Sequence, residues 1–297
     1  RGLTDGEIVS FLEGSFGAFQ ERQRREQWQW DLEVLHRALA DLERHGLVVR
    51  LDGNSLHLTP LGLVAGETAA QVSSIVRLID CFRALTPVEI NDPVLIAAVQ
   101  ITEELDQQIV PLNRKSTLKE PQAWSAALAR QGVPNCVLHS LAHSAQDTND
   151  QTMRQKRAVA CLLFVSGQEM TDIEQTLTQF GGALGGAAGP VRAVAARTCD
   201  LLPAAVRVAQ LLHPILDLES RSARLLTRLT YGLVGDAVPL AQTAGLDLRR
   251  GDYRRLVAAG LCNSLQIRAA PDAAILACVD GDPARLAVVR HAGEQMV

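Results

Sequence analysis

The sequence predicts a mainly α-helical protein with one small β-hairpin near its N-terminus. Aromatic residues make up only 4% of the 297 residues. The core therefore has to be built from Leu, Val, Ile and Ala, which favours helices over a sandwich or barrel. Apolar residues recur at helical spacing over most of the chain. The exception is a pair of short strand-like segments, 47–50 and 55–58, joined by the hairpin signal Asp52-Gly53-Asn54.

Length and charge limit the classes of protein that fit. At about 150 residues per domain, the chain predicts two or three domains. Hydrophobic residues are 47% and charged residues 21%, ordinary globular proportions that exclude wholesale disorder. The net charge of −4 excludes a uniformly basic protein that coats nucleic acid, but not local basic stripes.

Cysteines and apolar runs indicate the compartment. The six cysteines form no CxxC motif and lie in apolar segments, so we expect reduced core thiols in a cytoplasmic protein, associated with the nucleoid in a prokaryote. No apolar run approaches the roughly 18 residues of a membrane span, so we expect no membrane partner. The sequence starts at Arg1 without a methionine, and we expect it to be part of a longer protein.

Residues 1–68 predict a winged helix. Thr4, with a glutamate three residues later, is a capping box that starts a first helix. A second amphipathic helix covers residues 29–45, and Gly46 suits the position that ends it. The hairpin follows as the wing, and Pro60 then restarts a helix at its first position.

Residues 69–231 predict a helical bundle. Its longest and cleanest helix covers residues 190–212, with Pro190 at the first helical position. Pro203 lies inside this helix and predicts a kink or a local break.

Residues 232–297 predict a helix-hairpin-helix domain, because short helical segments alternate with glycines. The expected helices are 236–244, 250–259, 271–279 and 283–291, separated by Gly245, Gly260 and Gly281.

Enzymatic motifs are mostly absent from the sequence. There is no P-loop, and the glycine-rich segment 181–189 has neither the lysine nor the preceding strand of one, so we expect an interhelical loop there. His139, His143 and Asp147 share a helical face, but the glutamate of an HExxH motif is missing. With no GxSxG motif and no local Cys–His pair either, we expect no catalytic residue, no metal and no cofactor within these residues.

Arginine clusters are the best candidates for a functional site. Arg249, Arg250, Arg254 and Arg255 surround an expected interhelical turn, where two aspartates oppose four arginines, and this composition favours contact with phosphates. Arg192 and Arg197 open the long helix and could reach bases or phosphates, although a merely exposed pair fits the pattern equally well. Two further groups fit solvated or neutralised faces at least as well: Arg22, Arg24 and Arg25 between the first two helices, and Arg221, Arg224 and Arg228 on one helical face.

The order of the segments resembles a known family. The segments are Phe11-Leu12-Glu13-Gly14-Ser15-Phe16, Leu58-Thr59-Pro60-Leu61-Gly62, Leu85-Thr86-Pro87, Leu138-His139-Ser140-Leu141, Phe164-Val165-Ser166-Gly167, Gly189-Pro190-Val191-Arg192 and Arg254-Arg255-Leu256. Together they resemble the C-terminal accessory region of superfamily 2 DNA helicases of the archaeal repair-helicase type, found also in the helicase half of DNA polymerase theta. The resemblance covers nearly the whole chain.

The resemblance implies an accessory role in an ATP-dependent DNA helicase or translocase of DNA repair. The winged helix would brace the motor, the bundle would close a ring around the strand, and its "ratchet" helix would touch the bases. The helix-hairpin-helix would grip the emerging strand or inhibit the motor. The implied partners are single-stranded or forked DNA and the motor domains of the same parent chain. ATP and Mg²⁺ would belong to that motor, and no cofactor to these residues.

Two departures from the family pattern shift the expected contacts onto arginines. The turns after Arg192 supply no aromatic residue to stack on a base, and Asp247-Leu248-Arg249 replaces the Gly-x-Gly of the terminal hairpin. The alternative function is a non-enzymatic winged-helix regulator with a helical effector or dimerisation domain, in which residues 29–45 would read DNA. The acidic surface of that segment argues against it. A protein-interaction scaffold is the third possibility.

Overall fold

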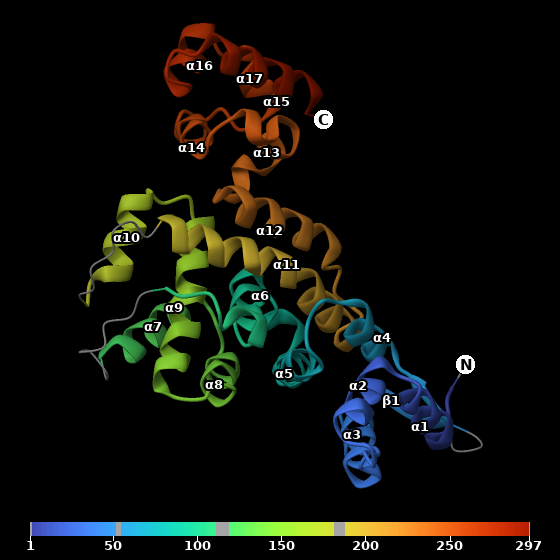
Figure 1. Ribbon diagram of the computed structural model, residues 1–297. Helices are drawn as coiled ribbons and strands as arrows, with labels where there is room; N and C mark the ends of the chain where they lie inside the picture. Colours follow the sequence, from blue (N-terminus) through green and yellow to red (C-terminus); the bar gives the residue numbers. More distant parts are fainter. Residues whose placement is uncertain (1, 52–54, 111–118, 181–187, 297) are drawn as a thin grey trace.

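The computed structural model describes residues 2–51, 55–110, 119–180 and 188–296. It is mainly helical with one two-stranded antiparallel sheet in the described residues, which confirms the predicted fold class at this level (Figure 1). The N-terminal helices and the hairpin lie at one end, the long helices α9, α11 and α12 in the middle, and α13–α17 form a lobe at the opposite end.

In the described residues, the N-terminal region contains four helices and the hairpin. Its elements are α1 (Asp5–Glu13), α2 (Phe16–Arg24), α3 (Leu32–Arg44), β1 (Val48–Leu51), β2 (Ser55–Leu58) and α4 (Pro60–Glu67). The predicted capping box is present, with Glu7 N bonded to Thr4 Oγ1 at 3.3 Å. Gly46 follows α3 at φ +73°, as expected, and Thr59 caps α4 with Pro60 at its first position.

Two boundaries differ from the prediction in this region. Helix α2 was not expected; Ser15 caps it by accepting a hydrogen bond from Ala18 N at 3.2 Å. Arg22 and Arg24 therefore lie in a helix, not between two helices. Helix α3 starts later than predicted because the Asp31 carboxylate accepts the amides of the first turn.

Close packing joins the hairpin to α4. Val48 pairs with Leu58 and Leu51 with Ser55, and Leu3 adds a bridge to Leu56 on the open edge. The turn at residues 52–54 lies outside the described residues. Gly62 in α4 lies so close to the main chain before β1 that a Cβ there would come within 1.9 Å of the Leu47 carbonyl oxygen.

The described part of the middle region is a bundle of ten helical elements. They are α5 (Val72–Arg83), η2 (Pro87–Glu89), α6 (Asp92–Val99), η3 (Glu103–Leu105), α7 (Lys119–Arg130), α8 (Asn135–His143), α9 (Thr148–Val165), α10 (Met170–Thr178), α11 (Ala188–Leu212) and α12 (Glu219–Tyr231). Helix α11 packs against α5, α6, α9 and α12, and also meets α4, so it links the N-terminal region to the bundle.

Helix α11 corrects two details of the prediction. It begins at Ala188, two residues before Pro190, which lies in the first turn where its missing N–H costs nothing. It also continues through Pro203 without a break. Pro203 is exposed, so water can reach that side of the helix, where the backbone donor is missing. Residues 181–187 of the glycine-rich segment lie outside the described residues.

The C-terminal lobe consists of short helices, as predicted. They are η4 (Gly235–Ala237), α13 (Val238–Ala244), η5 (Gly245–Asp247), α14 (Arg250–Ala258), α15 (Ser264–Ala269), α16 (Asp272–Cys278) and α17 (Pro283–Gln295). Gly245, Gly260 and Gly281 all have positive φ, which explains why glycine separates these helices. Helix α15 was not predicted, because six residues are too few to show a helical period.

Most of the buried apolar residues in the described ranges belong to two clusters. One runs from Leu47 to Leu229 and the other from Leu233 to Ala292. The boundary between them is Gly232, which ends α12 with φ +68° and ψ +51°. The lobe therefore has a hydrophobic core of its own and meets the bundle mainly through other contacts.

The contact between Gly62 and Leu47 is testable with a matched pair of substitutions in α4. Gly62→Ala should lower the free energy of unfolding by about 1–3 kcal/mol, because its methyl group has no room. Gly66→Ala meets no atom within 4 Å and should raise it by roughly 0.5–1 kcal/mol. Urea denaturation followed by circular dichroism measures both, and equal effects would contradict the packing described.

Candidate nucleic-acid interface

The six arginines expected to contact nucleic acid lie in or beside two helices. Arg192 and Arg197 are in the N-terminal half of α11. Arg249 precedes α14, and Arg250, Arg254 and Arg255 lie within it. Between the end of α11 and the start of α14 there are 37 residues, yet Arg192 and Phe164 line the same hollow and Arg250 lies over the ring of Phe164. The structure therefore brings Arg192 of the first group near Arg250 of the second.

Asp252 fixes the start of α14. Its carboxylate accepts the amide of Arg249 at 2.9 Å, which satisfies a free donor of the first turn. The same carboxylate is fully buried and pairs with Arg255 at 2.6 Å and Arg285 at 2.9 Å. Asp252 therefore neutralises Arg255, one of the four predicted arginines, together with Arg285.

Arg250 joins the lobe to the bundle. Its Nε donates to the carbonyl oxygen of Gly232 at 2.9 Å and its Nη2 to that of Gln168 at 2.6 Å. The guanidinium lies over the ring of Phe164, 5.0 Å from the ring centroid. Gly232 is required here, because a Cβ would come within 2.4 Å of Phe164 and 2.6 Å of Arg250.

Arg254 contacts the same turn, between α9 and α10. Its Nε donates to the carbonyl oxygen of Gly167, and its Nη1 forms an ion pair with the carboxylate of Glu169. The two arginines of α14 thus bind three successive residues of the turn. The Glu169 side chain is 59% exposed and that of Arg254 is 25% exposed, so solvent reaches this pair.

The electrostatics of the cluster follow from burial and from like charges. Burial lowers the pKa of Arg250 to about 10, and the neighbouring charges of Arg254 and Arg192 also lower it. Arg250 still carries its charge at neutral pH. The hydrogen bond from Arg254 holds the pKa of Glu169 below its usual value, so Glu169 remains an anion there. The positive charges of these arginines therefore outnumber the negative charge of the exposed Glu169 carboxylate beside them.

A hollow of about 250 Å³ adjoins the cluster between α9, α11 and α12. Phe164, Arg192, Cys199, Asp200 and Thr230 are among its lining residues. Phe164 is an aromatic beside Arg192 that comes from another helix, which the sequence of α11 alone did not reveal. Burial raises the pKa of the Cys199 thiol, so Cys199 is not an activated nucleophile.

The other predicted arginines differ in how far they are engaged. Arg197 pairs with Asp200 at 3.1 Å. Arg255 pairs with Asp252 and with Asp280 at 3.0 Å, and donates to the carbonyl oxygen of Cys278. Arg192 and Arg249 are exposed, and they are the members best placed to meet a ligand.

Helix α12 presents a second line of arginines beside a larger hollow of about 670 Å³. Arg228 pairs with Asp92 at 2.6 Å, and Arg221 donates to the carbonyl oxygen of Ile90 at 2.6 Å. Arg224 donates to the carbonyl oxygen of Gly235 at 3.4 Å. Two of these three side chains thus tie α12 to the segment that starts α6, while Arg224 contacts the lobe.

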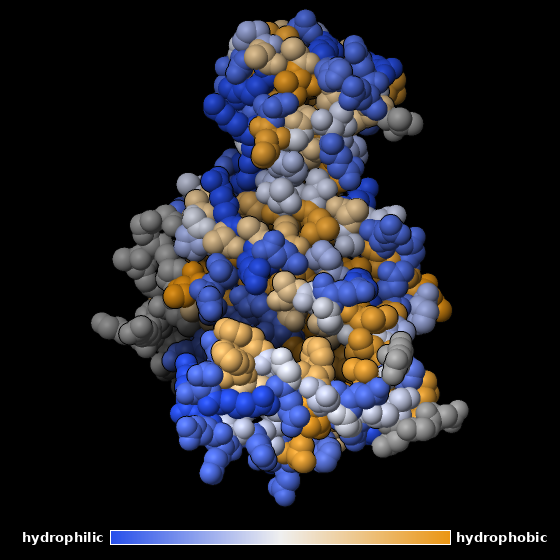
Figure 2. All heavy atoms as spheres, turned by 45° about the vertical axis from the view of Figure 1, so that its right-hand side comes forward, coloured by the Kyte–Doolittle hydropathy of each residue, from blue (hydrophilic) through white to orange (hydrophobic). Residues whose placement is uncertain are grey.

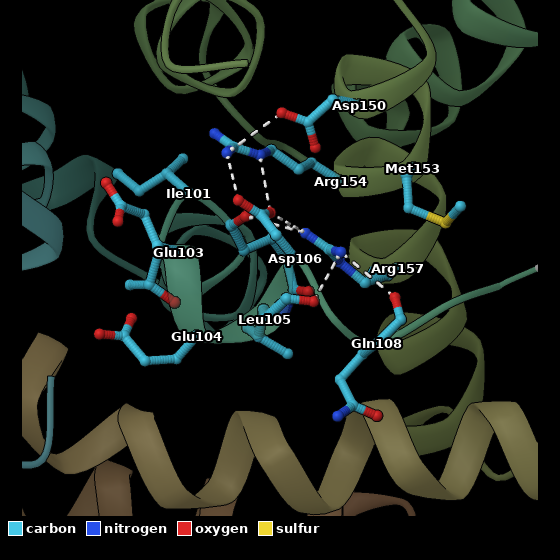
Figure 3. Close-up of polar contacts among 12 residues, drawn as sticks. Ile101, Glu103, Glu104, Leu105, Asp106, Gln108, Asp150, Met153, Arg154 and Arg157 are labelled. Atoms are coloured by element: carbon cyan, nitrogen blue, oxygen red, sulfur yellow. Dashed lines mark hydrogen bonds and ion pairs between the residues drawn. The ribbon is translucent and has the colours of Figure 1, made fainter. Parts of the chain in front are cut away.

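A third group of cations is buried in α9 and was not singled out in the sequence. Asp106 lies between the guanidinium groups of Arg154 and Arg157, 2.8 Å and 3.0 Å away (Figure 3). Arg157 also donates to the carbonyl oxygens of Leu105 and Gln108. Both arginines are at most 1% exposed, so they fix the segment around η3 and cannot meet a ligand.

Lys156 is engaged in a separate buried pair. It binds Glu120 at 2.7 Å and lies 5.3 Å from the ring centroid of Trp124. Burial lowers the pKa of this lysine, and Glu120 opposes the shift. The pair joins α7 to α9.

The two histidines that were expected to share a helical face both lie in α8. The rings of His139 and His143 stack with their centroids 5.5 Å apart, and Asp147 caps α9 by accepting the amide of Asp150 at 2.8 Å. Over the described ranges, no group of three or more His, Cys, Asp and Glu is arranged to hold a metal ion.

Neither a family model nor a curated protein matches the chain. Among the helices of the described residues, none has the length and continuous hydrophobicity that a membrane span requires. The chemistry of the site therefore rests on its own geometry, an arginine cluster beside an aromatic-lined hollow.

The network around Asp106 yields a stability prediction. Asp106→Asn leaves the buried Arg157 without its paired carboxylate and Arg154 with Asp150 alone, and should lower the free energy of unfolding by about 3–5 kcal/mol. Asp80→Asn, at an exposed position of α5, should change it by no more than roughly 0.5 kcal/mol. Chemical denaturation followed by circular dichroism measures both, and a small effect at Asp106 would show that the network does not hold this segment.

Proposed function

We propose that this chain is the accessory C-terminal region of an ATP-dependent superfamily 2 DNA helicase or translocase, in which it guides and grips a single strand of DNA. Residues 1–68 act as a winged helix, residues 69–231 as the ratchet bundle and residues 232–297 as a helix-hairpin-helix domain. The motor, with its ATP and Mg²⁺, belongs to another part of the parent protein. The order of the observed elements supports this assignment.

The observation that carries the proposal is the position of Arg192. It is exposed in the second turn of α11, at the edge of the hollow lined by Phe164, and near Arg250. A guanidinium can pair with a phosphate and stack on a base, and the positive end of a long helix favours the phosphate further. Arg249 extends the same cationic surface at the start of α14.

The exposed side of α11 provides a path for the strand. Arg192, Ala196, Asp200, Pro203 and Arg207 are all exposed, and their spacing places them on one side of the helix. Arg207 at the far end pairs with Glu67 of α4 at 2.9 Å. The stripe thus extends from the arginine cluster to the N-terminal region.

The N-terminal region supports contact with the motor domains of the same parent chain. Phe11, Phe16 and Phe19 are 74%, 70% and 56% exposed, which is unusual for such large apolar side chains. Helix α3 is a poor candidate for reading DNA, because three carboxylates outnumber two arginines on its exposed side, which carries Glu33, Arg37, Asp41, Glu43 and Arg44. These features favour the helicase assignment over the winged-helix regulator.

Binding of fluorescent oligo-dT over a series of salt concentrations tests the proposal. Arg192→Ala should weaken binding and reduce the slope of log affinity against log salt by about one unit, because one phosphate contact is lost. Arg130→Ala removes the same charge from an exposed position of α7, outside the stripe, and should leave the slope unchanged.

Two results would overturn the proposal. One is a wild-type chain that fails to bind oligo-dT even at low salt, which would favour a scaffold. The other is a sequence-specific footprint on duplex DNA, which would favour the regulator.

A further inference from the structure

The C-terminal lobe is held on the bundle by polar contacts. Its hydrophobic cluster is separate from that of the bundle, and Figure 2 shows a narrower neck between the two parts. At the junction, Arg250 and Arg254 bind the turn between α9 and α10, and Arg224 reaches Gly235. A junction of this kind responds to competing ions more than an apolar interface would.

The three arginines of α14 differ in their freedom to change partner. Arg250 is half-buried against Phe164 and bonded to two carbonyl oxygens. Arg255 is held by two aspartates of its own lobe. Arg254 pairs with the exposed carboxylate of Glu169, which solvent and a competing anion can reach. Arg254 is therefore the member that can exchange its anion.

Glu169 lies where a phosphate would be attracted. It pairs with Arg254, and the charges of Arg250 and Arg255 also act on it. A carboxylate and a phosphodiester both offer anionic oxygens to a guanidinium, so they compete for the same donors.

We propose that Glu169 occupies the anion site of Arg254 in the free protein, and that a phosphate of the bound strand displaces it and loosens the C-terminal lobe from the bundle. This inference rests on the proposed function and adds a regulation of the same site. The lobe is held in place by an internal anion when no strand is present, and binding of the strand exchanges that anion for a phosphate.

Glu169→Gln tests both parts of the inference. Hydrogen exchange of residues 232–237 in the protein without DNA should become faster, because the lobe has lost an ion pair. Affinity for oligo-dT should rise about two- to fivefold, because the competing carboxylate is gone. Glu219→Gln, which removes an exposed carboxylate from α12, should change neither measurement.

A charge swap separates docking of the lobe from binding of the strand. Glu169→Arg and Arg254→Glu should each speed hydrogen exchange of the junction. The double variant should restore the slow exchange while binding of oligo-dT stays weaker than in the wild type, because the arginine now lies on the turn and not on α14.

The outcomes are distinguishable from a failure of the proposed function. If the wild type binds oligo-dT and Arg192→Ala weakens it, but Glu169→Gln alters neither exchange nor affinity, the inference is wrong and the function stands. Failure of the double variant to restore slow exchange would also overturn the inference. If the wild type binds no oligo-dT, both fall.

Discussion

The C-terminal end of α9 is the point on which the arrangement of the molecule depends. A helix ends with carbonyl oxygens that have no partner within the helix, and here arginines from two other elements bind them and the turn that follows. Arg228 of α12 donates to Val165, and Arg254 and Arg250 of α14 donate to Gly167 and Gln168. One helix end thus positions the bundle, the lobe and the cationic surface together.

Arginine rather than lysine makes this arrangement possible. Only Lys115, Lys119 and Lys156 are lysines among the 29 basic residues. A guanidinium offers five donors in a rigid plane, so Arg250 can bind two carbonyl oxygens and still lie over the ring of Phe164. Many of the arginines therefore bind groups within the protein. For this reason, a cluster of arginines in the sequence contains more charges than a ligand can reach.

Local signals in the sequence predicted most helices and the hairpin. They could not predict which side chains from distant parts of the sequence contact one another. The capping box at Thr4, the glycine after α3 and the glycines of the lobe all lie within a few residues of what they determine. The partner of Arg250 at Gln168 is 82 residues away, and no periodicity encodes it. Asp252 was expected to oppose the arginine cluster, and in the structure this buried carboxylate pairs with Arg255 of the cluster and with Arg285, which the sequence did not indicate. The grouping of Arg192 with the α14 arginines, and the presence of Phe164 and Glu169 among them, likewise required the packed structure.

The glycine at position 232 has a consequence for building chimeras of this chain. Gly232 lies at the end of α12 with a left-handed backbone, and it leaves no room for a Cβ. It therefore forms part of the site that binds the Arg250 side chain. In a chimera, a foreign C-terminal lobe would have to be joined after Gly232. It would also need an arginine at the position of Arg250, to bind the carbonyl oxygens of Gly232 and Gln168. The boundary at which the C-terminal lobe can be exchanged is therefore set by the contacts of Arg250 with the bundle, and not by the end of α12.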